Sequence, residues 1–545
     1  MVAASAQTTN SVTKNLTLED CLETALQHNF DVQIKRFSPE IARYTLGVSY
    51  AGYDPLYSFS GEHDYNLSPG GVDPQFGPFP GTQNESDRFN TAVQGLLPWG
   101  LSYNVGGNLS DRVTTQSGAL VDETSSGNVG VLQLRQPVLR NSWIDSTRLS
   151  IAVNKRNLKI SELDLRSQVM STVTAVEEAY YNLIFAEENV KVQKAALELA
   201  KRLLAENKKK VEVGALAPLD EKQAQSQVAS SEADLLAALG TRDTQQRVLK
   251  NLLSDDYSKW GDVDPQPTET LLAVPQSFNK QESWERGLSL RPDLLQAKLS
   301  LEKQGYVVRF QKNQLFPQLD LFGTYGFNAG NTPEYSGALG QIQRGTSPFY
   351  SAGAGVSIPL GNAAARSNYK AAKATKAQIT LQLKQLQQTV LVQIENAIAV
   401  AVTSFERIKA TREASRYAQD ALEAEQKKLE NGKSTNFEVL QLQKNLTAAR
   451  SAEIRALADY NNALAELALN EGTTLERRHV NLEVKSVSVR CPWSVVRCPG
   501  RVAPAEKLYR LPKEISKMAG QTCRFAATTR RSSPTISEIS FGNHS

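Results

Sequence analysis

The chain has few cysteines, few histidines and almost no excess charge. Its 545 residues include four Cys and four His, little material for a disulfide framework or a multi-ligand metal site. Lys and Arg number 61 against 57 Asp and Glu, and this balance gives no case for nucleic-acid binding. The sequence also lacks a phosphate-binding Gly loop and any local catalytic spacing around its histidines. We therefore expect no enzyme, no cofactor, no metal and no nucleic-acid partner.

Long apolar runs are missing as well. No stretch approaches the ~18 apolar residues that a membrane-crossing helix needs, so the sequence predicts no transmembrane helix. A β-barrel is not excluded by this test. Its strands alternate lipid-facing and inward-facing side chains, so their average hydropathy stays modest.

The two ends of the chain differ from its body. Ala4-Ser5-Ala6 resembles the small-residue end of a secretory signal peptide whose earlier parts are absent, and a disordered tail is the alternative. The segment from Arg477 onward holds 13 basic residues and 4 acidic ones. Cys491 and Cys498 are separated by six residues without an ordered His set, which disfavours a metal pair. We expect an unstructured or aberrant extension there.

The body of the chain repeats itself. Residues 26–32 parallel residues 288–294, an offset of 262, and residues 213–220 parallel residues 431–438 at the shorter offset of 218. Self-similarity of this kind indicates two copies of one structural unit. The change of offset predicts an inserted loop or hairpin in the first copy, within residues 67–126.

Each copy contains one very long predicted helix. Residues 145–213 and 363–430 have no interior Pro or Gly, and apolar residues recur along both at steps of three and four. About 68 residues at ~1.5 Å each give roughly 100 Å of helix. A Gly follows each helix and suits the left-handed conformation of a helix end. Shorter helices are expected over residues 39–52, 218–253, 292–314 and 436–469.

Strands are predicted between the helices. Residues 57–66 and 318–328 alternate apolar and polar side chains, the period of a half-exposed strand, and return strands are expected at 127–137 and 352–359. One or two hairpins per copy cannot close a sheet alone, and open sheet edges seek partners. Several chains around an axis would close a barrel at one end and a helical cylinder at the other.

These residues resemble the outer-membrane efflux channels typified by TolC, over nearly all of residues 16–472. The local marks are Leu16-Thr17-Leu18-Glu19-Asp20, Gln136-Pro137-Val138-Leu139 and the turn from Gly432 to Leu440. The resemblance implies a mainly α fold with a β-barrel contribution, in which internally duplicated long helical hairpins and a few strands per protomer build a trimeric α/β barrel tunnel. A soluble periplasmic coiled-coil rod or adaptor protein is the alternative.

The resemblance also implies partners and a function. The barrel of a homotrimer would lie in outer-membrane lipid and its helical tunnel would extend into the periplasm, for passive export of small molecules or proteins. An inner-membrane pump would supply energy, and a periplasmic adaptor would join pump and channel. The implied adaptor contacts are the turns Gly214–Leu219 and Gly432–Phe437 at the helix tips. The residues expected to make them are Gly214, Ala215, Leu216, Ala217, Gly432, Lys433, Ser434 and Thr435.

A gate at the tips carries over only in part. Asp220 and Glu438 match the family's acidic positions, whereas the next family carboxylate is Gln441 here. The Tyr and Arg that hold the gate shut in that family correspond to Leu429 and Ser434, so an ionic lock is in doubt. A ring of Glu438 from three chains would favour cations. Stabilisation of a helix N-terminus is the alternative role of both carboxylates.

The same reading divides the chain into five segments. Residues 1–15 are expected to be disordered or a signal-peptide remnant, 16–260 the first repeat, 261–275 a linker, 276–472 the second repeat, and 473–545 an atypical basic tail.

Overall fold

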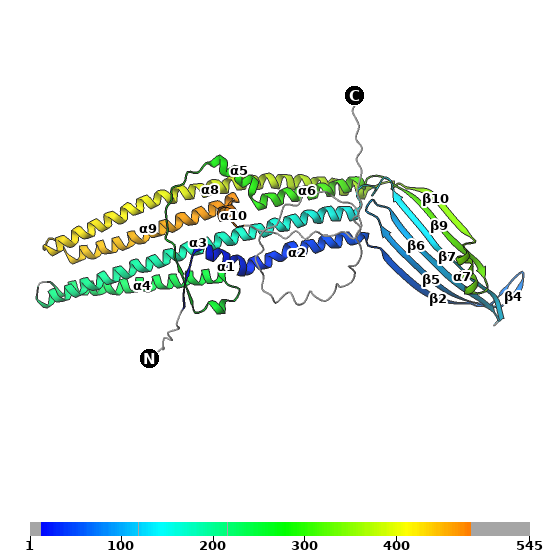
Figure 1. Ribbon diagram of the computed structural model, residues 1–545, viewed down its shortest axis with the longest axis horizontal. Coiled ribbons are helices and arrows are strands. Elements are labelled where there is room, and N and C mark those ends of the chain that lie inside the picture. The colour runs from blue at the N-terminus through cyan, green and yellow to red at the C-terminus, as the bar shows by residue number, and fades with distance from the viewer. Residues whose placement is uncertain (1–11, 118, 215, 481–545) are drawn as a thin grey trace, which may run out of the picture. The chain divides into compact units, whose positions relative to one another are not determined.

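Two helices of nearly equal length dominate the fold. The computed structural model describes residues 12–117, 119–214 and 216–480. Within them α3 (Ser146–Glu212) has 67 residues and α8 (Ala363–Glu430) has 68, which confirms the two long helices. Each turns back at a Gly into a return helix of 36 residues, α4 (Pro218–Leu253) or α9 (Asn436–Glu471). The two hairpins are visible in Figure 1.

Pairs of shorter helices precede the strands of each repeat. They are α1 (Leu18–His28) and α2 (Phe30–Tyr50) in the first, and α5 (Lys280–Leu290) and α6 (Pro292–Asn313) in the second. The helix expected at residues 39–52 begins nine residues earlier than predicted. The Asn29 side chain accepts from the backbone N–H groups of Asp31 and Val32 and starts α2 there, so Pro39 lies inside the helix.

Six long antiparallel strands form one sheet. Its order is β10-β9-β7-β6-β5-β2. The strands are β2 (Leu56–Ser68), β5 (Thr82–Leu96), β6 (Ser102–Gln116), β7 (Ala119–Pro137), β9 (Gln318–Thr332) and β10 (Pro348–Ser357). The first repeat thus supplies four strands and the second supplies two. The connections carry a small hairpin of β3 (Gly71–Asp73) and β4 (Gly77–Phe79), and a helix, α7 (Tyr335–Arg344).

The inserted segment adds strands to the middle of this sheet. β5 pairs with β2 on one side and with β6 on the other, and β6 pairs with β7. The turn between β5 and β6 is closed by hydrogen bonds from Leu97 N–H to Leu101 O and from Gly100 N–H to Leu97 O, both 2.8 Å. The inserted segment is therefore integrated into the sheet between β2 and β7.

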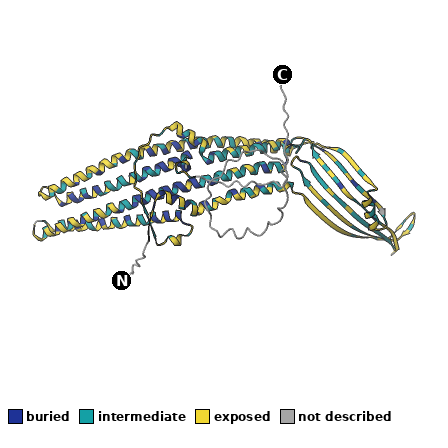
Figure 2. Cartoon of the chain, in the orientation of Figure 1, coloured by how far each residue is buried: buried dark blue, intermediate teal, exposed yellow. Residues whose placement is uncertain are grey.

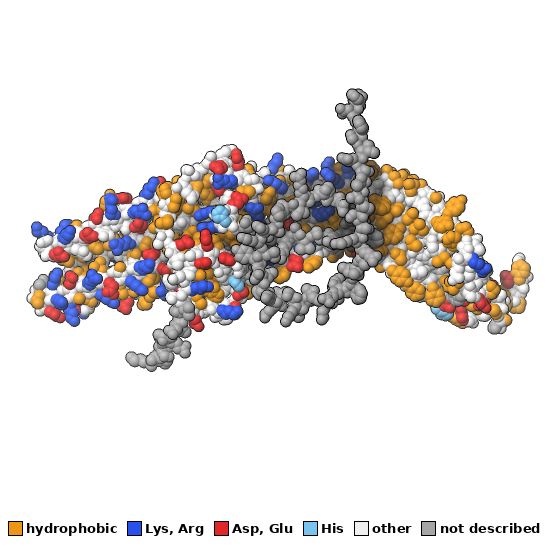
Figure 3. All heavy atoms as spheres, in the orientation of Figure 1, with side chains coloured by type: hydrophobic (Ala, Val, Ile, Leu, Met, Phe, Trp, Pro, Cys, Tyr) orange, Lys and Arg blue, Asp and Glu red, His pale blue; other side chains and the backbone are white. Residues whose placement is uncertain are grey.

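The two faces of the sheet differ in polarity. One cross-strand row is apolar on all six strands: Tyr57, Val93, Val105, Leu132, Tyr325 and Tyr350. The next row, on the opposite face, is polar on five of them: Gln94, Asn104, Gln133, Thr324 and Ser351. Figure 3 shows hydrophobic side chains gathered over the sheet, while charged side chains are scattered over the helices. One face suits lipid and the other suits water.

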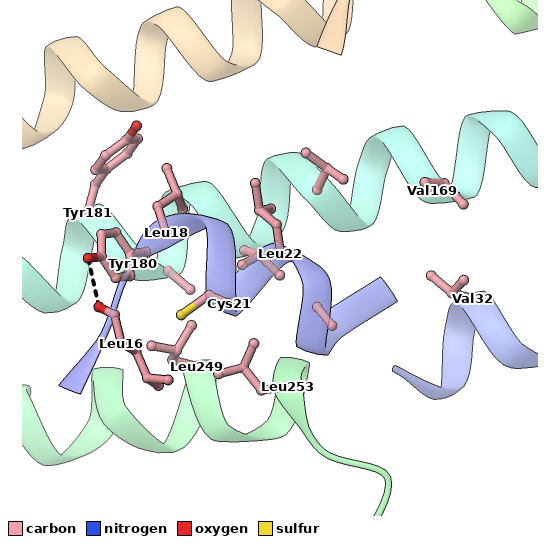
Figure 4. Close-up of a cluster of buried hydrophobic side chains, with 14 of the residues drawn as sticks. Leu16, Leu18, Cys21, Leu22, Val32, Val169, Tyr180, Tyr181, Leu249 and Leu253 are labelled. Atoms are coloured by element: carbon pink, nitrogen blue, oxygen red, sulfur yellow. Dashed lines mark hydrogen bonds between the residues drawn. The ribbon is translucent and has the colours of Figure 1, made fainter. Parts of the chain in front are cut away.

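A small parallel sheet and the main apolar core lie beside the middle of α3. β1 (Val12–Leu16) pairs with β8 (Val263–Pro267), and the Tyr180 hydroxyl donates to the Leu16 carbonyl at 3.1 Å (Figure 4). Cys21 is fully buried here, and burial raises the pKa of its thiol to about 12. Residues 12–15 and 263–267 are therefore strands, where a disordered segment and a linker were expected. They are ordered because each strand completes the other's backbone hydrogen bonds.

The described chain continues beyond the second repeat. The short helix α10 (Thr474–Arg477) follows α9, and Leu475 joins the main core at 5% exposed. The atypical tail expected from residue 473 thus begins no earlier than residue 481. The cysteines at 491, 498 and 523 lie outside the described residues.

Within the described residues one helix, α8, is long and apolar enough to cross a membrane, with a mean hydropathy of 1.2 over 18 residues. This value is an average over the window, so it does not contradict the absence of an unbroken run of ~18 apolar residues from the sequence. The apolar residues of α8 lie on both sides of Gln393, Glu395 and Asn396, so the average is high although no unbroken run exists. α8 packs against α6 and α9, and we count it as part of the helical bundle.

Candidate functional site

The turn between α3 and α4 depends on a glycine. The N–H of Gly214 donates to the Val211 carbonyl at 2.9 Å, and the Val213 N–H donates to Lys209 at 3.2 Å. Gly214 has a φ of +76°, which side chains other than glycine adopt at a cost. Leu216 and Ala217 complete the turn before Pro218 starts α4, and Ala215 lies outside the described residues. The position predicted for this tip is confirmed as a turn.

The turn between α8 and α9 has the same design. Gly432 has a φ of +69° and donates to the Leu429 carbonyl at 3.0 Å, and the Lys433 N–H donates to Lys428 at 2.8 Å. The Thr435 hydroxyl caps α9 by accepting from the Glu438 N–H at 3.4 Å. Both tips therefore end one helix with a left-handed Gly and begin the next within four residues.

Ser434 has a partner within its own hairpin. Its hydroxyl donates to Oε1 of Glu425 at 2.5 Å, and Lys428 Nζ lies 2.9 Å from Oε2 of the same carboxylate. The hydrogen bond from Ser434, followed by that from Lys428, lowers the pKa of Glu425 below its usual range. Ser434 thus ties the turn back onto α8.

Large apolar side chains are exposed at both tips. Leu219 is 66% exposed and Phe437 is 61% exposed, and the two occupy equivalent positions of the repeat. Val213 adds a third exposed apolar side chain, at 79%. Both residues end the turns expected to bind an adaptor, but the exposure of their side chains was not predicted from the sequence. The available signal was a large apolar residue directly before the acidic residue in the first turn of each return helix.

Charges at the tips follow the helix dipoles. Lys209, Lys210, Lys427 and Lys428 lie in the last turns of α3 and α8, while Asp220, Glu221 and Glu438 lie in the first turns of α4 and α9. Cations at a helix C-terminus and anions at an N-terminus are both stabilising. Figure 3 shows blue and red side chains at the ends of the hairpins as well as along their length.

The three candidate gate residues belong to two different hairpins, Asp220 to that of α4 and the other two to that of α9. Asp220 is half-buried at the start of α4, whereas Glu438 and Gln441 are exposed on α9. Exposed residues prevail at the ends of both hairpins (Figure 2). Gln441 Nε2 donates along its own helix to Asn445 Oδ1 at 3.1 Å. Asp220 and Glu438 lie in the first turns of α4 and α9, the return helices of different hairpins (Figure 1). A ring of either carboxylate therefore needs further copies of the chain.

The two hairpins contact each other through polar groups along α3 and α9. Gln443 Nε2 on α9 donates to the Ala196 carbonyl on α3 at 3.1 Å, and Ser451 Oγ donates to Asn189 Oδ1 at 2.8 Å. A cavity of about 210 Å³ lies nearby between α3, α8 and α9, lined by Leu203, Val439 and other side chains. Among the described residues no group of three or more His, Cys, Asp or Glu could hold a metal.

Comparisons with known proteins agree with this architecture. The sequence pattern of the family described as outer membrane efflux protein matches residues 90–254 and 285–473. The alkaline protease secretion protein AprF of Pseudomonas aeruginosa is 23% identical over 76% of this chain and 84% of its own length. TolC of Vibrio cholerae is 23% identical over 42% of this chain, and the cobalt-zinc-cadmium resistance protein CzcC of Cupriavidus metallidurans is 25% identical over 32%. Those two matches span only 48% and 40% of the relatives' own lengths.

Solved structures show the same fold. The outer-membrane channel OprN superposes with a TM-score of 0.62 at 17% identity, covering 84% of this chain and 90% of that one. The Campylobacter jejuni CmeC outer membrane channel superposes with a TM-score of 0.61 at 18% identity, covering 86% and 90%. The family pattern matches well over half of the sequence and both repeats. The chain belongs to the outer membrane efflux protein family.

Proposed function

We propose that this chain is the outer-membrane channel subunit of a tripartite efflux or type I secretion system and exports cargo passively. The observation that carries the proposal is the presence, on one chain, of a sheet with one apolar face and of two long hairpins with exposed tips. The sheet suits insertion into lipid. The hairpins extend away from it far enough to reach partners in the periplasm (Figure 1). The chain carries no catalytic role in this account.

Three copies of the chain form the channel in this proposal. Family members work as trimers with adaptor and inner-membrane pump partners in general. A single six-stranded sheet leaves two open edges, which other copies would cover. The two repeats, residues 16–260 and 276–472, place equivalent hairpins side by side, so three chains would present six tips.

The helix tips are the proposed contacts for the periplasmic adaptor. The first tip comprises Gly214 to Ala217 and the second Gly432 to Thr435, and exposed Leu219 and Phe437 stand beside them. Equivalent apolar anchors with a polar surround suit a protein partner. The adaptor would grip both tips in the same way because the two turns share one backbone design.

The same ends supply the proposed gate. Glu438 is exposed in the first turn of α9, and three copies would bring like charges together at the narrow end and favour cations. Asp220 would contribute a second, less exposed carboxylate. Gln441, Leu429 and Ser434 depart from the family's gate residues, so we propose an acidic constriction without the family's ionic lock.

The class of cargo does not follow from the relatives, because their names refer to both metal resistance and protease secretion.

The alternative of a soluble rod is disfavoured by the apolar row of the sheet, because an exposed apolar row is unfavourable in water.

Reconstitution of the purified full chain into planar lipid bilayers tests the proposal. Discrete conductance steps are expected, and their absence from a preparation of intact trimers would overturn the channel function. The test variant is Val105→Lys on the apolar row, which should impair insertion. The matched control is Asn104→Lys on the polar row, which should not. Equal insertion of both variants would contradict the assignment of the lipid face.

A further inference from the structure

The sheet of one chain has two open edges that run in opposite directions. All neighbouring strands are antiparallel, and with six strands the first, β2, therefore points opposite to the last, β10. Within the described residues β2 pairs only with β5 and β10 only with β9. The free edge of β10 can thus continue the antiparallel ladder onto the free edge of β2 of another copy, head to tail.

A stripe of six large apolar side chains stands on α2, directly before β2. Its members recur at steps of four and three and are each between 55% and 72% exposed: Phe30, Ile34, Phe37, Ile41, Tyr44 and Val48. The opposite side of α2 packs on α3 through buried Val32 and Leu46. A heptad stripe of this kind is the seam of a helix pair, and among the described residues of one chain no helix covers it.

α8 offers the matching surface directly after β10. Residues at steps of three and four on its exposed side are mostly small: Ala364, Ser367, Ala371, Ala374, Gln378 and Leu381. Small side chains form the shallow groove that bulky ones can enter. The stripe on α2 and this face of α8 have almost the same length, because each spans about five turns. Each edge of the chain thus combines a helix with a strand. One edge consists of α2 and β2, and the other consists of β10 and α8.

Strand number agrees with the width of the helical layer. Next to the sheet each chain has four helices in the order α2, α3, α6, α8. At about 8–10 Å each they cover roughly 32–40 Å of circumference. Six strands spaced about 4.7–4.9 Å apart and tilted 35–45° cover roughly 34–42 Å. Without the inserted β5 and β6, four strands would cover only about 23–28 Å, less than the helices below them.

We infer that three copies of this chain close one eighteen-stranded barrel, in which β10 of each copy pairs with β2 of the next and the α8 face packs on the α2 stripe of the next. The inference rests on the proposed trimeric channel and specifies its wall. Barrels of 16–18 strands leave an aqueous channel. The barrel is then as wide as the helical tunnel, and cargo size is limited at the helix tips rather than in the outer membrane.

The experiment locates the inserted hairpin by its contact with lipid. The background is the full chain with serine at 491, 498 and 523. Single cysteines replace Val93 or Val105 on the apolar row and Gln94 or Asn104 on the polar row, and a bimane label on each is quenched by brominated lipid in vesicles. Tyr325→Cys and Thr324→Cys on β9 serve as references, because β9 lies outside the insertion.

Strong quenching at Val93 and Val105 with weak quenching at Gln94 and Asn104, as at the reference pair, is the expected result. Loss of this alternation on β5 and β6, with the reference pair and the trimer mass intact, would show a smaller barrel and overturn the inference while leaving the channel function in place. A protein that is not a trimer would overturn the proposed function itself.

A second measurement tests the edges. Cysteine pairs that combine Ser58 or Ser60 on β2 with Ser351 or Ser357 on β10 are oxidised in the membrane. At least one pair should give covalent trimers. Pairs that combine Asn104 on the central strand β6 with the same β10 positions should give none. Covalent trimers from the control pairs would contradict the proposed seam. The absence of covalent trimers from every β2–β10 pair would contradict it as well.

Discussion

Arg478 donates from its guanidinium Nε to the carboxylate of Glu177, although 301 residues separate them in sequence. The Glu177 side chain is only 1% exposed, and the same guanidinium donates to the Tyr181 hydroxyl at 3.0 Å. The end of the described chain is thereby fastened to the middle of α3, beside the main apolar core that Leu475 also enters. Residues 473–480 are part of the folded body.

Removal of this ion pair from one side should destabilise the protein strongly. Arg478→Met leaves the Glu177 carboxylate buried without a partner, which costs about 3–5 kcal/mol in comparable sites. Thermal unfolding of the detergent-solubilised protein measures the effect. The double variant Glu177→Met with Arg478→Met should recover much of the loss, and equal losses in single and double variants would contradict the pairing.

Truncation tests the contribution of residues 473–480. A chain that stops after Gly472 should melt several degrees below one that stops after Val480, because Leu475 and Arg478 are removed. Identical melting temperatures for the two truncations would show that residues 473–480 contribute nothing.

Substitution of a tip glycine should abolish export without loss of trimers. Gly432→Val forces a side chain into a φ of +69°, at a cost of about 1–2 kcal/mol, and distorts the turn proposed to hold the adaptor. Gly240→Val is the control, since Gly240 lies within α4 with no other atom within 4 Å of an added Cβ. Drug or protein export in cells is compared with trimer content. Normal export by Gly432→Val would argue against the tip as an adaptor contact.

Charge at the proposed gate should set ion preference. Glu438→Gln removes one negative charge per chain and is expected to lower cation selectivity, and Gln441→Glu, one turn along α9, is expected to raise it. Reversal potentials in a salt gradient across a planar bilayer report both. Unchanged potentials in the two variants would place these side chains away from the constriction.

Stability should fall as the pH rises from about 4.5 to about 7. Burial, and then the charge of Asp264, raise the pKa of Glu187 from 4.5 to about 7, while Lys191 and Arg242 oppose the shift. Between these values the folded state binds more protons than the unfolded state, so the free energy of unfolding decreases with pH. Glu187→Gln should flatten this part of the profile, whereas Glu198→Gln, exposed on the same helix, should not. An unchanged profile in Glu187→Gln would contradict the assignment.

Local signals account for the helices that the sequence predicts well. α4 begins at Pro218 and ends at Leu253 as expected, because Pro suits the first turn of a helix. The long helices follow from the absence of breakers and the glycines at 214 and 432. The expected start of α2 at Pro39 is wrong, because the Asn29 side chain caps a helix that begins nine residues earlier.

Long-range relationships were beyond the local signals. β1 and β8 pair across some 251 residues, and neither strand has a period that predicts it. The change of repeat offset predicted an insertion, but its integration into the sheet depends on the register of β5 with β2 and β6. The exposed anchors Leu219 and Phe437 look like ordinary apolar residues until their burial is known.

The most direct test of the central claim is the native mass and membrane location of the full chain, exported into the envelope of a double-membrane host and solubilised in detergent. A trimer recovered from the outer-membrane fraction is the predicted result. A monomer or dimer recovered from the soluble periplasmic fraction would contradict the channel and favour a periplasmic rod.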